Sequence, residues 1–184
     1  MLQEQTPIIA YLVNNAGGGR MGASSEFSQD EIKSHITTHC TATAVLCNLS
    51  IPYLQEGSHI INMASQSAFQ PVPYINLYAA SKAFVRSYSR ALNVELRGTG
   101  IVCTVACPGW IKTELLEPER NGKQVHFPAM ALAEDVAAQI LRDAKKGKDV
   151  SVYSTYVKFM HLVSKVFPHK LVMSSWLKQI KEYI

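Results

Sequence analysis

Short apolar runs along the chain alternate with longer segments of helical periodicity. Three such runs lie at residues 8–13, 59–63 and 101–106, and a fourth short strand is expected at 149–153. Continuous apolar runs of this length, bounded by turn residues, are typical of strands buried on both faces of a parallel sheet. The pattern therefore predicts an α/β fold in which strands and helices alternate.

Helical segments are expected between these strands. Ser28 is followed three residues later by Glu31, which is the spacing of a capping box. The helix that it starts should continue to about Ser50 and stop before the next proline. Its close-packed face, which would suit a second subunit, is indicated by three small residues: Cys40, Ala44 and Cys47. Two further helices are expected at 76–96 and 133–145.

The chain is expected to form one domain, residues 1–153, with a helical extension, residues 154–184, packed on it. The extension should comprise two amphipathic helices separated by Pro168. Its charged residues are nearly all basic: Lys158, Lys165, Lys170, Lys178 and Lys181. Packing on the domain or on a subunit neighbour is favoured. A lid over an apolar substrate and docking on an anionic membrane surface are the alternatives.

Composition excludes several classes of protein. Hydrophobic residues make up 47% of the chain and charged residues 17%, as in ordinary core-forming domains. The net charge of +4 is too small to indicate a nucleic-acid partner. No apolar run approaches the ~18 residues of a membrane span, and residues 1–7 lack the features of a signal peptide. The four cysteines have no metal-ligand spacing, so we expect reduced core thiols, no metal site and a cytoplasmic location.

Candidate chemistry is concentrated between Ser65 and Lys82. Tyr78 and Lys82 are four residues apart, so on a helix they share one face. A nearby ammonium would lower the pKa of the phenol, which is near ~10 when free, and so suit it to exchange a proton with a carbonyl or alcohol oxygen. Ser65, 13 residues before Tyr78 at the end of an apolar run, could hydrogen-bond the same oxygen. Ser67 is a nearby alternative for this hydroxyl.

The glycine-rich stretch 17–22 contains Gly-x-Gly-x-x-Gly after an expected strand, which is the pattern of a dinucleotide-binding turn. We reject this interpretation for two reasons. The next helix should begin near Ser28, so its N-terminus could not face a pyrophosphate held at the glycines. In addition, no Asp or Glu lies between Glu31 and Glu56 to hold a ribose hydroxyl.

Three motifs together resemble the short-chain dehydrogenase/reductase family. They are Val13-Asn-Asn-Ala-Gly17, Tyr78-Ala-Ala-Ser-Lys82 and Pro108-Gly-Trp-Ile-Lys-Thr113, in the order and spacing of that family, and the resemblance covers residues 8 to 150. It implies a Rossmann-like, doubly wound parallel sheet that binds NAD or NADP. It further implies hydride transfer between the nicotinamide and a ketone or secondary alcohol, in a homo-oligomer.

The resemblance also implies roles for single residues. Tyr78 would be the acid/base, Lys82 would tune it and hold the cofactor ribose, and Ser65 would polarise the carbonyl. Backbone of Asn15, Ala16 and Gly17 would approach the cofactor. Pro108 and Gly109 would border it at the carboxyl edge of the sheet, where ligands bind in open α/β folds. Ile111 and Thr113 would contact its nicotinamide side.

Two positions leave alternatives open. Thr113 could instead cap a short helix at residues 114–116. The family usually has a catalytic Asn at the position of His39, and a histidine there could anchor a proton-relay water or be a tolerated polar residue.

The chain resembles only the later part of a short-chain dehydrogenase. The family begins with a strand, a glycine-rich turn that binds the cofactor phosphates, and further strands, and we expect the chain to be N-terminally truncated with an incomplete sheet. An uncovered sheet edge at residues 8–13 would invite pairing with another chain. The alternative to an enzyme is therefore an inactive remnant that acts as an oligomerisation module. A bulky apolar substrate is expected from the apolar extension.

Overall fold

The structure is a computed structural model that describes residues 7–114, 116, 119–120 and 122–184. Its main sheet has four parallel strands in the order β1-β2-β3-β6. The strands are β1 (Tyr11–Asn14), β2 (His59–Met63), β3 (Val102–Ala106) and β6 (Val150–Ser151). The parallel α/β fold expected from the sequence is confirmed, although β1 and β6 are shorter than the runs that predicted them.

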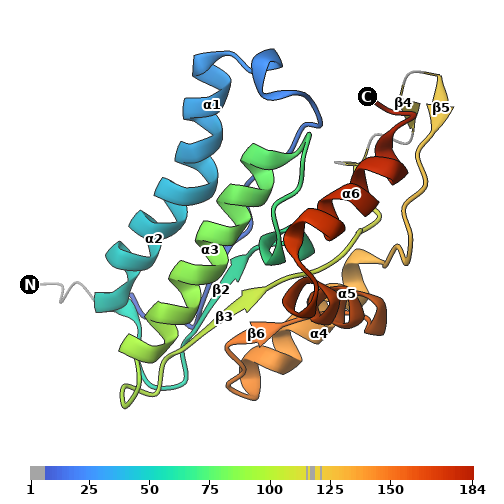
Figure 1. Cartoon of the computed structure of the whole chain (residues 1–184). Coiled ribbons are helices and arrows are strands. Elements are labelled where there is room, and N and C mark those ends of the chain that lie inside the picture. Colours follow the sequence, from blue (N-terminus) through green and yellow to red (C-terminus); the bar gives the residue numbers. More distant parts are fainter. Residues whose placement is uncertain (1–6, 115, 117–118, 121) are drawn as a thin grey trace, which may run out of the picture.

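Helices cover both faces of this sheet (Figure 1). The α-helices are α1 (Gln29–Ile36), α2 (Ala42–Ser50), α3 (Asn76–Glu95), α4 (Ala133–Lys145), α5 (Thr155–Val166) and α6 (His169–Ile180). Short helical turns are η1 (Ser24–Glu26), η2 (Thr37–Thr41), η3 (Ile51–Tyr53) and η4 (Gln66–Phe69), of which η2 is a π-helical turn. A two-stranded hairpin joins β4 (Glu119–Arg120) to β5 (Lys123–Gln124).

The long helix expected from Ser28 to Ser50 is divided by the π-helical turn. Its predicted capping box is present: the Ser28 hydroxyl accepts a hydrogen bond from the Glu31 backbone, and the Glu31 carboxylate accepts one from the Ser28 backbone. From α1 the chain passes through η2 into α2 without a break. The extra residue in a π-helical turn rotates the side chains that follow it, and such turns are frequent at functional sites.

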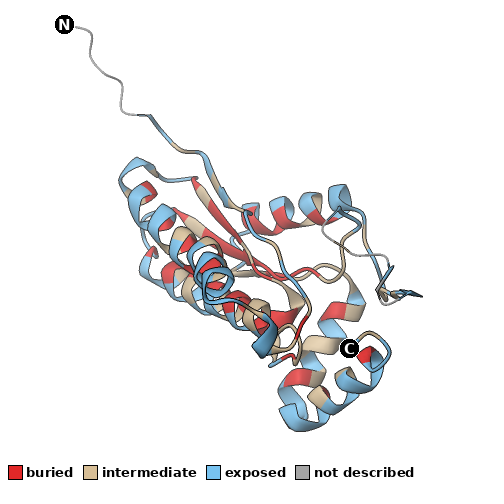
Figure 2. Ribbon diagram, turned by 90° about the horizontal axis from the view of Figure 1, so that it is seen from above, coloured by how far each residue is buried: buried red, intermediate tan, exposed pale blue. Residues whose placement is uncertain are grey.

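The core lies in two layers, one on each face of the sheet. Neighbouring strand residues point to opposite faces, so Ile60 packs with Cys47 and Leu92 from α2 and α3, whereas Ile61 packs with Val136 and Ile140 from α4. Figure 2 shows the buried strands between these helical layers. This is the doubly wound arrangement implied by the family resemblance.

The small-residue face of the second helical segment packs inside the chain. Cys47 is fully buried in the core and receives a hydrogen bond from Asn14, and Cys40 contacts the Ser81 carbonyl on α3. The close packing expected for this face is therefore confirmed for Cys40 and Cys47, and it occurs within the domain rather than against a second subunit. All four cysteines are buried with free thiols.

Residues 117 to 130 lie between β3 and α4. Their described part contains the β4–β5 hairpin, and Glu117, Pro118 and Asn121 lie outside the described residues. A short helix capped by Thr113 is not seen in the described residues, since the Thr113 hydroxyl donates to the Ile111 carbonyl. Leu115 of that segment also lies outside the described residues.

The extension folds as two helices on either side of Pro168, as expected. His161 on α5 packs on the ring of Phe69, and Trp176 on α6 donates a hydrogen bond of 2.9 Å to the Pro73 carbonyl. These contacts place α5 and α6 beside the segment that joins β2 to α3 (Figure 1). Within the described part of the chain, no helix combines the length and the apolar character that crossing a bilayer requires.

Candidate active site

The carboxyl ends of three parallel strands bring the predicted site residues to one edge of the sheet. In the strand register, Asn14 lies beside Asn62, and Met63 lies beside Ala106. The segments that follow are therefore neighbours: Asn15–Gly17 after β1, Ser65 after β2, and Pro108–Gly109 after β3. This is the edge at which open α/β folds bind ligands.

Ser65, Tyr78 and Lys82 meet at this edge. Ser65 begins η4, where its hydroxyl accepts a hydrogen bond from the Ser67 backbone. Tyr78 lies in the first turn of α3, and the Ser65 side chain interacts with its phenol and lowers its pKa. Lys82 is one turn further on the same helix, with its ammonium 5.5 Å from the centre of the Tyr78 ring. The alternative hydroxyl, Ser67, is buried and its oxygen has no hydrogen-bond partner among the described residues.

The pKa of Tyr78 differs from the expectation. Burial raises the pKa of this phenol, and the interaction with Ser65 opposes the rise without reversing it. Lys82, which was expected to lower the pKa, donates its hydrogen bond to the Met63 carbonyl at 2.7 Å instead. Burial lowers the pKa of Lys82 itself to about 8. Without a ligand, Tyr78 is therefore a neutral phenol at neutral pH.

His39 lies in the π-helical turn and is only 2% exposed. Its Nε2 lies 2.8 Å from the Gly18 carbonyl, so Nε2 carries the proton and donates it. Its Nδ1 is buried and has no partner among the described residues. Burial, with the neighbouring Lys82 and His35, lowers the pKa of His39 to about 4. His39 is therefore a neutral side chain that fastens the loop after β1.

That loop passes close to both His39 and Tyr78. Gly17 has φ of +148°, and a Cβ at this position would lie 2.3 Å from the His39 ring, so only glycine fits. A Cβ at Gly19 would lie 2.8 Å from the Tyr78 ring. A cavity of about 630 Å³ opens here between the loop, α1 and α3. Its lining includes Tyr78 and His39, whereas Ser65 and Lys82 lie outside the lining.

The segment after β3 is fixed to the segment after β2. The Pro108 carbonyl accepts a hydrogen bond of 2.8 Å from the Gln66 backbone. Gly109 lies against Val157 of α5, which leaves no space for a side chain. Ile111 forms a parallel bridge with Ala131 and is half-buried, and Thr113 is exposed. The chain therefore passes from Pro108, at the end of β3, to the bridge between Ile111 and Ala131 and then to the exposed Thr113.

Sequence reasoning missed two features of the site. His35 stacks on His39 with ring centres 4.1 Å apart, and the four-residue spacing of the two histidines on one helix was a signal for this contact. The side-chain Oδ1 of Asn62 accepts a 2.7 Å hydrogen bond from the Asn14 side chain, and the Asn62 Nδ2 donates one of 2.8 Å to the Ser89 hydroxyl. Asn62 thus joins β1, β2 and α3 directly beneath the site, and a polar residue inside an apolar run was its signal.

Comparison with known proteins identifies relatives of this chain. The family model described as short chain dehydrogenase matches residues 1–124. The ketoacyl reductase HetN of Nostoc is 35% identical over 139 residues, which are 74% of this chain and 48% of that protein. The mouse 17-beta-hydroxysteroid dehydrogenase type 3 is 36% identical over 117 residues, which are 61% of this chain and 38% of that protein. The chain thus spans about half the length of such curated relatives, or less.

Solved structures give the same fold. A short-chain dehydrogenase from Sphingobium yanoikuyae in complex with NADPH is 25% identical, with a TM-score of 0.70 over 90% of this chain and 65% of that one. A short-chain dehydrogenase from Burkholderia cenocepacia, in complex with NADP, is 22% identical and has a TM-score of 0.76 over 92% of this chain and 71% of that one. From the family model, which covers most of the sequence, and from this shared architecture, the chain belongs to the short chain dehydrogenase family.

Proposed function

We propose that this chain carries the proton-transfer half of an NAD(P)-dependent oxidoreductase that interconverts a ketone and a secondary alcohol through Ser65, Tyr78 and Lys82. The observation that carries the proposal is the contact of the Ser65 side chain with the Tyr78 phenol, with the Lys82 ammonium on the same side of the helix. Two hydroxyl groups side by side can hydrogen-bond one carbonyl oxygen, and the neighbouring cation stabilises negative charge on the phenol.

In this proposal the substrate oxygen lies between the Ser65 and Tyr78 hydroxyl groups. Ser65 donates a hydrogen bond that polarises the carbonyl. Tyr78 donates its proton to the oxygen as the alcohol forms, and the nearby Lys82 ammonium stabilises the phenolate that remains. His39 holds the Gly17–Gly18 loop in place and keeps its own proton on Nε2. Burial keeps Tyr78 protonated in the ligand-free site, so its proton is available to a carbonyl oxygen.

The residues at this edge fit the nicotinamide and ribose half of a dinucleotide, which would supply the hydride. Backbone of Asn15–Gly17 and of Pro108–Gly109 borders the edge, where Gly17 packs against the His39 ring and Gly109 against Val157. Lys82 is a buried cation without a carboxylate partner among the described residues, so its ammonium is available to a ribose hydroxyl. Ile111 and Thr113 lie further along the same border. NADP or NADPH is bound by several of the structural relatives, so NAD or NADP is the proposed cofactor.

An apolar substrate is favoured by the apolar extension and by the relatives. The loop that joins Ser65 to Tyr78 is held by Trp176 of α6, and the exposed face of the extension carries Phe167 and Leu171. The curated relatives include reductases of ketoacyl groups and a dehydrogenase of hydroxysteroids. A bulky, apolar ketone therefore suits both the apolar extension and the relatives. The four free thiols suit a reducing, cytoplasmic compartment.

Tyr78→Phe tests this assignment. The variant keeps the ring and removes the proton donor, so carbonyl reduction with NADPH should fall about a hundredfold or more. Tyr88→Phe is the matched control, because Tyr88 lies on the same helix and its hydroxyl donates to the Ala44 carbonyl, away from the site. Near-normal turnover of a folded Tyr78→Phe protein would remove Tyr78 from the mechanism.

A second candidate function is that of an assembly module without catalysis. It is favoured by apolar side chains exposed on α2 and α3: Val45, Leu46, Leu49 and Phe84. Faces of this kind on adjacent helices are typical of subunit interfaces. A stable dimer that fails to bind a nicotinamide nucleotide would support this function, whereas binding would support the enzyme.

A further inference from the structure

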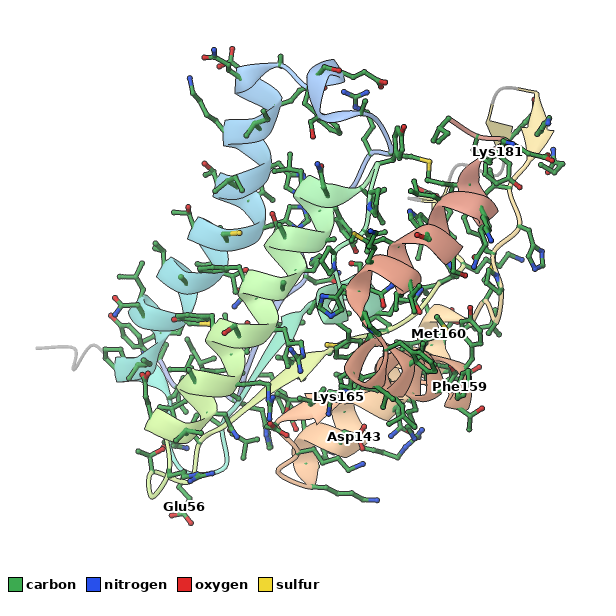
Figure 3. The ribbon with its side chains drawn as sticks, viewed as in Figure 1. Glu56, Asp143, Phe159, Met160, Lys165 and Lys181 are labelled. Atoms are coloured by element: carbon green, nitrogen blue, oxygen red, sulfur yellow. The ribbon has the colours of Figure 1, made fainter. Side chains whose placement is uncertain are left out.

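A second cavity lies away from Tyr78, between α3, α5 and the segment that leads into β6. Its volume is about 320 Å³, and no residue of its lining belongs to the lining of the first cavity. Six basic side chains border it: Arg86, Arg90, Lys148, Lys158, His161 and Lys165. In Figure 3, Lys165 on α5 and Asp143 on α4 mark two sides of this basic cavity.

Helical spacing brings these side chains together. Arg86 and Arg90 are four residues apart on α3, so they share a face, and Lys158, His161 and Lys165 follow the same rule on α5. The two faces approach each other at Phe69, where the Arg86 guanidinium lies 4.9 Å above the ring and His161 packs on it at 3.7 Å. The cavity is therefore shaped by packing, and α3 and α5 present five of its six basic residues.

Only part of this positive charge is neutralised by the protein. Arg90 pairs with Asp149 at 2.8 Å, and Lys148 pairs with Asp143 at 2.6 Å. Among the described residues, Arg86, Lys158 and Lys165 have no acidic partner. Two nitrogens of the lining, Arg86 Nε and His161 Nδ1, are buried and have no hydrogen-bond partner in the described part of the chain. A buried nitrogen without a partner is costly unless a ligand satisfies it, and the exposed Lys158 and Lys165 add positive charge beside these two nitrogens.

We infer that the basic cavity binds the phosphate group of an anionic ligand. Phosphate oxygens accept several charge-assisted hydrogen bonds, and guanidinium and ammonium groups are the usual donors to them. The cavity volume suits a phosphate or diphosphate group with little attached, rather than a whole dinucleotide. Between residues 150 and 181 the sequence contains no Asp or Glu, so α5 and α6 bring no acidic side chain that would compete for these cations.

The phosphate can come from two sources, which are a soluble phosphorylated molecule or the headgroup of an acidic lipid. Phe159, Leu162 and Val166 are exposed on the side of α5 next to the basic row, and such a face would lie against a bilayer in the second case. Both sources present the same chemistry to Arg86, Lys158 and Lys165. The experiment below distinguishes them.

Calorimetric titration of the full chain with inorganic diphosphate, in chloride buffer of fixed ionic strength, tests the site. We expect saturable binding, and we expect Lys158→Gln/Lys165→Gln to weaken it about tenfold or more. Lys170→Gln/Lys178→Gln removes the same charge from exposed positions outside the cavity and should bind like the wild type. Where the first double variant melts below the wild type in chloride, each single Lys→Gln variant replaces it.

Co-sedimentation with phosphatidylcholine vesicles, with and without phosphatidic acid, identifies the source. Binding that requires phosphatidic acid, is lost in Lys158→Gln/Lys165→Gln and is displaced by diphosphate indicates a lipid headgroup. Saturable diphosphate binding without vesicle binding indicates a soluble ligand. No saturable diphosphate binding and no phosphatidic-acid-dependent sedimentation, or equal losses in the two double variants, would overturn the inference.

Discussion

At the scale of single residues, proton chemistry at the site depends on contacts that spacing along the chain does not specify. The four-residue spacing of Tyr78 and Lys82 predicts correctly that they share a helix face. It does not predict that the Lys82 ammonium reaches the Met63 carbonyl, because that carbonyl belongs to a strand distant in sequence. The pKa of Tyr78 is consequently raised by burial rather than lowered by a cation.

His39 makes the stability of the fold depend on pH. Its pKa is about 4 in the folded chain and 6.5 in the unfolded chain, because burial removes the water that would stabilise the protonated ring. The unfolded chain therefore takes up a proton as the pH falls below 6.5, and the folded chain does so only near pH 4. The contribution of neutral His39 to the unfolding free energy is therefore complete above pH 6.5 and is lost as the pH falls from 6.5 to 4. This contribution is about 3 kcal/mol at most.

His39→Asn tests this linkage. Asparagine is smaller and does not titrate, so the unfolding free energy of the variant should fall less steeply between pH 6.5 and pH 4 than that of the wild type. Denaturant unfolding at a series of pH values measures the slope. His169→Asn, at an exposed position, serves as the control and should keep the wild-type slope. Equal slopes in wild type and His39→Asn would show that burial of His39 does not penalise its charge.

At the scale of elements, periodicity locates the strands and helices but not their irregularities. β2 and α4 have the bounds that the sequence predicts, because apolar runs and amphipathic spacing are strong signals. The π-helical turn around His39 was not predicted, since a π-helical turn and an α-helix have the same local composition. The packing of Cys40 and Cys47 within the domain depends on where α3 lies, which no local pattern reveals.

Asn62 is the polar link between elements beneath the site. It is fully buried, and its hydrogen bonds to Asn14 and Ser89 join β1 and α3 to β2. Asn62→Ala removes both hydrogen bonds and leaves a cavity in the core, so the unfolding free energy should fall by about 2–3 kcal/mol. Chemical denaturation measures the loss, with exposed Asn48→Ala as the control. A loss below about 0.5 kcal/mol would mean that the network does not hold the strands together.

At the scale of the whole molecule, the alternation of strands and helices along the chain predicts the layers of the domain. It does not predict which residues lie together on the surface. β1 is an edge strand of the described sheet, and Tyr11 and Val13 on it are exposed by 41% and 53%. Hydrophobic periodicity within one sequence does not predict that these apolar side chains are exposed, because it does not show which strand lies at the edge of the sheet. The same holds for the basic cavity, because its lining is assembled from α3, α5 and the approach to β6.

The central claim is that this sheet edge holds a nicotinamide ring beside Ser65, Tyr78 and Lys82. Fluorescence titration of the chain with NADPH tests it most directly, with Lys82→Ala beside the exposed Lys112→Ala as the matched control. We predict saturable binding by the wild type and by Lys112→Ala, and binding about tenfold weaker or more in Lys82→Ala, because the buried ammonium is the predicted ribose contact. No saturable binding by the wild type, or equal binding by all three proteins, would contradict the account.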